Sequence, residues 1–173
     1  PVTLIYDAPA LPSAEGGSLG ASGGLAALEA QLDKIDQIVE RVVSDGREGD
    51  ILIFRSGEKA IKDCMGRLDT GPAGKYLHTL PLYGRLGKDE QERVFDPAPK
   101  GKTKVVISTN IAETSVTIDG ITTVIDSGLA KLNYYNPRTF TSSLIEVPIS
   151  KASCNQRKGR AGRTREGTCY RLY

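Results

Sequence analysis

Three short segments with apolar residues at their centres constrain the fold of this chain more than any other feature of its sequence. They cover residues 50–54, 104–108 and 122–126, and the first is apolar from Ile51 to Phe54. Continuous apolar runs of this length are typical of strands in a parallel sheet that is covered on both faces. Because segments of helical pattern separate them, the sequence predicts an α/β fold with a mostly parallel sheet flanked by helices.

The clearest helical pattern begins at Leu25. From there apolar residues recur at steps of three and four positions as far as Val42, so we expect an amphipathic helix that ends near Ser44. Residues 13–24 are rich in Gly, Ser and Ala, and we expect a flexible loop there. The other expected elements are strands at 2–6, 77–83 and 167–173 and helices at 57–68, 88–95 and 151–158.

One region departs from the alternation of strands and helices. Two β-rich stretches, 132–135 and 140–147, flank the turn residues Asn136-Pro137-Arg138. Turn residues between two such runs are typical of an antiparallel pair. The sequence therefore predicts a β-hairpin over residues 131–147.

Length and composition describe one globular domain with an uneven distribution of charge. The chain has 173 residues, of which 39% are hydrophobic and 25% are charged, as is ordinary for a soluble protein. Its net charge is only +2, yet residues 151–173 hold seven basic residues and one acidic residue. Such a basic block is either a solvated face or a surface for nucleic acid.

Several classes of protein are disfavoured. No apolar run approaches the roughly 20 residues that span a bilayer, and the N-terminus has no signal-peptide pattern, so we expect no membrane partner. Three widely spaced cysteines favour a reducing compartment, and a single histidine excludes a multi-histidine metal site. Gly101-Lys102-Thr103 resembles the end of a phosphate-binding loop, but position 96 is Asp where that loop needs Gly. We therefore expect no nucleotide hydrolysis by this chain alone.

A polar segment at residues 108–120 directly follows one of the apolar runs. Ligands bind at the carboxyl ends of strands in open α/β sheets, so its hydroxyl, amide and carboxylate groups could bind phosphate or sugar. The same composition also fits a polar loop with helix-capping residues. The residues alone leave both interpretations open.

A second candidate site lies in the basic segment. If this segment is helical, Gln156, Arg160 and Arg163 lie on one face. Gly159 and Gly162 remove side-chain bulk beside them, so that a ligand or a facing domain can approach closely. Two guanidinium groups and an amide on one face suit the γ-phosphate of a nucleotide.

Together these segments resemble the second RecA-like lobe of DEAH-box (DEAH/RHA) ATP-dependent RNA helicases of superfamily 2. Residues 50–58 resemble motif IV of that family, residues 108–120 motif V and residues 156–163 motif VI. The resemblance covers nearly the whole chain outside 13–24, and the form of residues 155–160 is closer to the bacterial branch. It implies that residues 1–173 form a helicase C-terminal lobe, with a RecA-like three-layer fold and a protruding hairpin.

The resemblance implies roles at the nucleotide. Gln156, Arg160 and Arg163 would face the γ-phosphate and its attacking water, with the two arginines as fingers. Phe95 would stack on the adenine. Ser115, Thr117 and Asp119 would contact the nucleotide from motif V. The cofactors implied are ATP and Mg²⁺, held mainly by the first lobe.

The resemblance also implies an RNA site and partners. Ser56, Gly57, Thr109 and Asn110 would contact the backbone of single-stranded RNA without reading its sequence, during translocation from 3′ to 5′. The hairpin at 131–147 would help to separate strands. The other expected partners are the first RecA-like lobe and the C-terminal domains of the parent chain, in the cytoplasm or, for a eukaryotic RNA-processing member, in the nucleus.

Two departures from the family leave alternatives open. The phosphate-binding loop and the DEAH motif are absent from this chain, and Arg55-Ser56 stands where many members have an apolar residue and Thr. The chain could instead be a non-catalytic RNA-binding or adaptor module on a RecA-like scaffold. A helicase of superfamily 2 that acts on DNA is the other alternative.

Overall fold

A computed structural model describes residues 1–9 and 21–173. Within these ranges the main sheet has six strands, all parallel. The α/β prediction is therefore confirmed. In spatial order the strands are β1 (Val2–Tyr6), β8 (Gly167–Arg171), β5 (Ile121–Asp126), β2 (Asp50–Phe54), β4 (Thr103–Ser108) and β3 (Leu77–Leu82).

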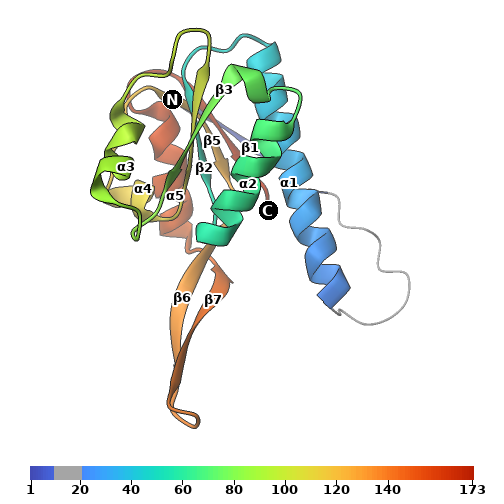
Figure 1. Ribbon diagram of the computed structural model, residues 1–173, viewed down its shortest axis with the longest axis vertical. Helices are drawn as coiled ribbons and strands as arrows, with labels where there is room; N and C mark the ends of the chain where they lie inside the picture. Colours follow the sequence, from blue (N-terminus) through green and yellow to red (C-terminus); the bar gives the residue numbers. More distant parts are fainter. Residues whose placement is uncertain (10–20) are drawn as a thin grey trace.

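Helices cover both faces of the sheet, which gives the three layers (Figure 1). The face toward the right of the figure carries α1 (Ala21–Ser44) and α2 (Glu58–Thr70). The opposite face carries α3 (Lys88–Glu92), α4 (Ile111–Thr114) and α5 (Lys151–Gly159). Short 3-10 turns are η1 (Gly74–Tyr76), η2 (Arg93–Phe95) and η3 (Arg160–Gly162).

The predicted loop at 13–24 is partly wrong. Helix α1 begins at Ala21, so residues 21–24 are helical, while residues 13–20 lie outside the described ranges. The stability of α1 comes from packing of the apolar stripe further along the helix. Once that stripe is packed, Ser22, Gly23 and Gly24 can join the helix despite their low helix propensity, because propagation is much cheaper than nucleation.

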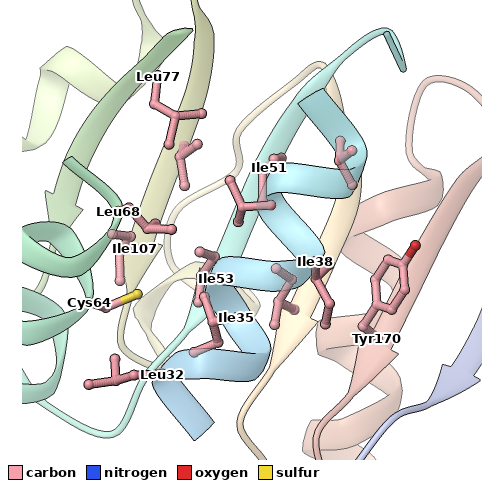
Figure 2. Close-up of a cluster of buried hydrophobic side chains, with 14 of the residues drawn as sticks. Leu32, Ile35, Ile38, Ile51, Ile53, Cys64, Leu68, Leu77, Ile107 and Tyr170 are labelled. Atoms are coloured by element: carbon pink, nitrogen blue, oxygen red, sulfur yellow. The ribbon is translucent and has the colours of Figure 1, made fainter. Parts of the chain in front are cut away.

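Alternate residues of each central strand enter two separate cores. Ile51 and Ile53 of β2 face α1 and α2, and Leu52 and Phe54 face the opposite layer. Figure 2 shows the first core, where Ile35 and Ile38 of α1 lie over the sheet. Because both sides of β2 are buried beyond Asp50, the strand is apolar from Ile51 to Phe54.

The predicted hairpin is present. Strands β6 (Leu129–Asn136) and β7 (Thr141–Pro148) pair in antiparallel register and project from the sheet just after β5 (Figure 1). Most of its side chains are exposed. No helix within residues 1–9 and 21–173 has both the length and the hydropathy to cross a bilayer.

Candidate functional site

Four of the predicted site residues meet at the carboxyl edge of the sheet. Ser56 and Gly57 follow β2, and Thr109 and Asn110 follow β4. Since β2 and β4 are parallel neighbours, their following loops lie side by side. All four residues line one open pocket of about 400 Å³, which also takes residues from the hairpin and from the segment after β3.

The hairpin contributes two charged residues to this pocket region that the sequence did not identify. The hydroxyl of Ser56 donates a hydrogen bond to the carboxylate of Glu146 on β7. The side chain of Lys131 on β6 lies against Gly57, where a Cβ atom would come within 3.0 Å of Lys131 Cε. Lys131 and Glu146 are direct register partners across the hairpin. Alternation along β6 and β7 could have paired them, but it could not place them over Ser56.

Gly57 lies against the flexible end of the Lys131 side chain, and the pocket is mainly basic. Lys59, Arg85 and Lys131 line it, with Glu58 as the acidic member. Glu58 is held by Lys62 at 2.8 Å, and its pKa lies below the usual range chiefly because of this hydrogen bond. A basic open pocket with hydroxyl and amide donors can bind the phosphates of a nucleic-acid backbone.

The second set of predicted residues lies on the face that carries α5. The guanidinium Nε of Arg163 is 3.8 Å from the carboxylate of Asp119, so the polar segment at 108–120 and the basic segment at 156–163 meet here. Both side chains are exposed. Gln156 is also exposed, and Arg160 is half-buried with its Nε atom unpartnered among the described residues.

The helix predicted at 151–158 is confirmed as α5, but the register that would place Gln156, Arg160 and Arg163 on one face of an α-helix does not hold. Helix α5 ends at Gly159 and the chain continues as the 3-10 turn η3, so the spacing of four and seven residues does not run through one α-helix. The proposed reason for Gly162 is also wrong. A Cβ atom there would lie 2.5 Å from Val2 Cγ2, so Gly162 lets η3 pack on β1.

The remaining nucleotide-site candidates are exposed and dispersed. Ser115 and Thr117 lie between α4 and β5, and Phe95 in η2 has 56% of its surface exposed. Among the described contacts, no hydrogen bond or ion pair joins them to Arg163 or Asp119. The loop that carries Phe95 is held by the buried Lys104, whose Nζ donates to the carbonyl oxygens of Val94 and Asp96 at 2.7 and 3.0 Å.

Arg157 is the residue that sequence reasoning missed most clearly. Its side chain is fully buried, and it donates from Nε to Glu113 at 2.7 Å and from Nη1 to Asp126 at 2.8 Å. Nη2 donates to the carbonyl oxygen of Leu129 at 3.2 Å, and the guanidinium stacks 4.6 Å from the ring centroid of Phe54. One side chain thus joins α5 to α4, to the end of β5 and to the base of the hairpin.

The sequence carries no local signal that singles out Arg157. Neighbouring helix residues point about 100° apart, so an outward Gln156 does not decide whether Asn155 or Arg157 turns toward the sheet. A buried arginine requires carboxylate partners. Glu113 and Asp126 are more than 30 residues away along the chain, however, and no local pattern links them to it.

Arg55 is a second buried guanidinium, next to the first pocket. It is 3% exposed and donates from Nη1 to Gln31 Oε1 at 2.6 Å, while its Nε atom has no partner among the described residues. Burial lowers the pKa of this side chain. The position that departs from the family pattern in sequence therefore places a desolvated cation beside Ser56.

The described residues fit part of a nucleotide site and no metal site. Arg160 and Arg163 are donors of the kind that binds phosphate, and the unpartnered Arg160 Nε leaves capacity for a further hydrogen bond. In residues 1–9 and 21–173, no three His, Cys, Asp or Glu side chains form a group that could hold a metal ion. This set fits the terminal phosphate of a nucleotide, but it does not fit Mg²⁺.

Comparisons with known proteins bear on the family and the fold. The model of the helicase conserved C-terminal domain matches residues 31–165. The ATP-dependent RNA helicase HrpA of Borreliella burgdorferi is 49% identical over all 173 residues, which make up 19% of its length. Two crystal structures of HrpB from E. coli, described as a DExH-box NTPase and a DEAH/RHA helicase, have TM-scores of 0.77 and 32% identity. They match 99% of this chain and 19% and 20% of their own.

Proposed function

Because the chain belongs to the helicase conserved C-terminal domain family, as the second RecA-like lobe of a DEAH/RHA helicase, we propose that it is half of an ATP-dependent RNA motor. The chain spans about a fifth of the length of these relatives, 19% of HrpA. The activity belongs to the longer protein. In our proposal ATP lies between this lobe and a first lobe that holds the triphosphate and Mg²⁺.

The observation that carries the proposal is the pair of separate sites joined by Arg157. Arg163 and Asp119 lie on one face of the lobe, and Ser56 with Thr109 lies at the carboxyl edge of the sheet. Arg157 lies in α5, which continues through η3 to Arg163. It also contacts Leu129 at the base of the hairpin, which reaches Ser56 through Glu146. A lobe that binds nucleotide at one site and RNA at another can couple its closure over the nucleotide to movement of the bound RNA.

At the nucleotide, Gln156 orients the attacking water, and Arg160 and Arg163 stabilise negative charge on the transferred phosphoryl group. Hydrolysis of the bound ATP would supply the free energy that drives the motor. Phe95 packs against the base as a flat apolar surface, and Ser115, Thr117 and Asp119 approach the sugar and phosphates. Asp119 also holds Arg163 in place until nucleotide arrives, because the two side chains already form an ion pair at 3.8 Å.

At the RNA, Ser56, Gly57, Thr109 and Asn110 bind backbone phosphates. These contacts position the strand without reading its bases, so binding is independent of sequence and weakens with salt. Opening and closing of the lobes moves this grip along the strand from 3′ to 5′. The exposed hairpin stands beside the strand and separates it from its complement.

Replacing Arg163 with Ala in the intact parent protein tests the proposal. An arginine finger contributes about 10³–10⁵ to the rate of phosphoryl transfer, so RNA-stimulated ATP hydrolysis should fall by at least this order. The matched control is Arg165→Ala. Arg165 is exposed in the same basic segment, its ion pair among the described residues is with Glu48 at 3.5 Å, and its loss should leave the rate nearly unchanged.

Two results would count against the proposal. A loss of less than about tenfold for Arg163→Ala would remove the finger assignment, since it is far below the contribution of a finger. Equal or better stimulation of hydrolysis by single-stranded DNA than by RNA of the same sequence would identify a DNA-acting helicase. A parent protein that binds RNA without hydrolysing ATP would be an adaptor.

A further inference from the structure

The base of the hairpin places a negative charge where the proposed RNA site needs positive charge. The carboxylate of Glu146 accepts the hydrogen bond of the Ser56 hydroxyl. Lys131, its register partner on β6, extends over Gly57 in the same pocket. The hairpin thus brings one cation and one anion to the loop that follows β2.

Glu146 and an RNA phosphate compete for the same donor. The Ser56 hydroxyl has a single proton, so it cannot donate to two acceptors at once. The residue is only 7% exposed, which leaves little room for a second acceptor beside it. A carboxylate beside a phosphate also repels it. We propose that Glu146 is a built-in competitor for RNA phosphate at Ser56, and that RNA must displace its side chain to bind. This inference rests on the proposed function.

The structure provides a place for the displaced carboxylate. A small pocket of about 120 Å³ next to the first one is lined by Arg55, Ser56, Lys59, Lys131 and Glu146 itself, with Asp63 as the other acidic residue. Asp63 is already held by Lys59 Nζ at 3.2 Å. The buried Nε atom of Arg55 has no partner among the described residues. Arg55 therefore offers a cation to Glu146 once phosphate has taken the Ser56 hydroxyl.

This exchange links RNA occupancy to the position of the hairpin. Glu146 belongs to β7, and its contact with Ser56 is a side-chain hydrogen bond that ties β7 to the loop after β2. When phosphate takes the Ser56 hydroxyl, the Glu146 carboxylate pairs with Arg55 instead. The base of the hairpin is thereby held by Ser56 without RNA and by Arg55 with RNA.

Glu146→Gln in the intact parent protein tests the inference. Glutamine keeps the shape and still accepts a hydrogen bond, so the change removes only the charge. We measure the dissociation constant for a fluorescent single-stranded RNA by anisotropy, without nucleotide. Repulsion between two unit charges in contact in a hydrated site changes a dissociation constant by about fivefold. The variant should therefore bind RNA about fivefold more tightly at low salt. The gain should shrink as salt is raised.

Three further measurements separate the possible outcomes. Glu92→Gln, an exposed residue of α3, should leave affinity unchanged and so excludes a general effect of net charge. Single-stranded DNA of the same sequence should gain as much as RNA from Glu146→Gln, because phosphate is common to both. Adding Ser56→Ala to the Glu146→Gln variant should weaken binding again.

Each failure has a distinct meaning. If Glu146→Gln leaves affinity unchanged or lowers it while Ser56→Ala still weakens binding, the competitor is wrong and the RNA site stands. A loss confined to RNA would show that Glu146 accepts the ribose 2′-hydroxyl instead. If Ser56→Ala has no effect in the Glu146→Gln background, the proposed RNA site itself is wrong.

Discussion

Replacing Arg157 with Met should be among the most destabilising single changes in this lobe. The side chain is 0% exposed and is the partner of two carboxylates, on Asp126 (0% exposed) and Glu113 (9% exposed). Methionine fills part of the volume but leaves both charges buried without a cation. Breaking a buried pair by removing one partner costs about 3–5 kcal/mol.

The assay is urea unfolding of the 173-residue chain at neutral pH, followed by circular dichroism. We expect the free energy of unfolding to fall by about 3–5 kcal/mol with an unchanged slope against urea. The control is Arg165→Met, which should stay within about 0.5 kcal/mol because Arg165 is exposed. Arg157→Lys should fall between the two, since lysine keeps the charge but cannot reach three acceptors in a planar fork.

A second variant isolates the ion pair from the loss of packing. Asp126→Asn combined with Arg157→Met should cost less than the sum of the two single changes, by at least about 1 kcal/mol, because it removes a buried charge that Arg157→Met leaves unpaired. Strict additivity would refute the reasoning. So would a loss below about 1 kcal/mol for Arg157→Met alone, against the 3–5 kcal/mol expected.

Two further predictions concern the packing of the sheet. Gly167→Ala should lower the free energy of unfolding by about 3 kcal/mol in the same urea assay, because a Cβ atom would lie 2.2 Å from the carbonyl oxygen of Ala161. The control is Gly66→Ala, where a Cβ atom would have no neighbour within 4 Å. Burial raises the pKa of the Cys64 thiol to about 12, so a thiol reagent at pH 8 should label Cys64 only on unfolding. The unfolded thiol ionises near pH 9 and the folded one does not, so stability should fall as pH rises above 9, by about 1.4 kcal/mol per unit for this group. Cys64→Ala should reduce that slope, and rapid labelling of the native thiol would contradict the argument.

Most of the fold could be predicted because each strand and helix carries its own pattern. The apolar run at Asp50–Phe54 indicated a strand buried on both faces, and the structure has it in the middle of the parallel sheet. The start of α1 could not be predicted in the same way. Ser22, Gly23 and Gly24 are poor helix formers, and they are helical as the continuation of an apolar stripe that is packed further along the helix.

For the candidate sites, the position of a residue at the end of a strand was predictable, and its contacts with distant residues were not. Ser56 and Thr109 could be expected at one edge because each follows a strand, and parallel neighbours end at the same edge. The partners of these residues were not predictable. Glu146 is 90 residues from Ser56, and nothing in the pattern of β7 says which loop its base will meet.

Apart from the start of α1, the amino-acid sequence alone determined which segments form strands and helices and which side of each is buried, since those properties depend on the spacing of apolar residues within one element. Only the tertiary structure decided which elements lie against one another. The order β1-β8-β5-β2-β4-β3 places Arg157 over the ends of β5 and β2, and sets Gly162 against Val2. Periodicity reports that a face is buried, but the identity of what covers it depends on contacts between residues far apart in the chain.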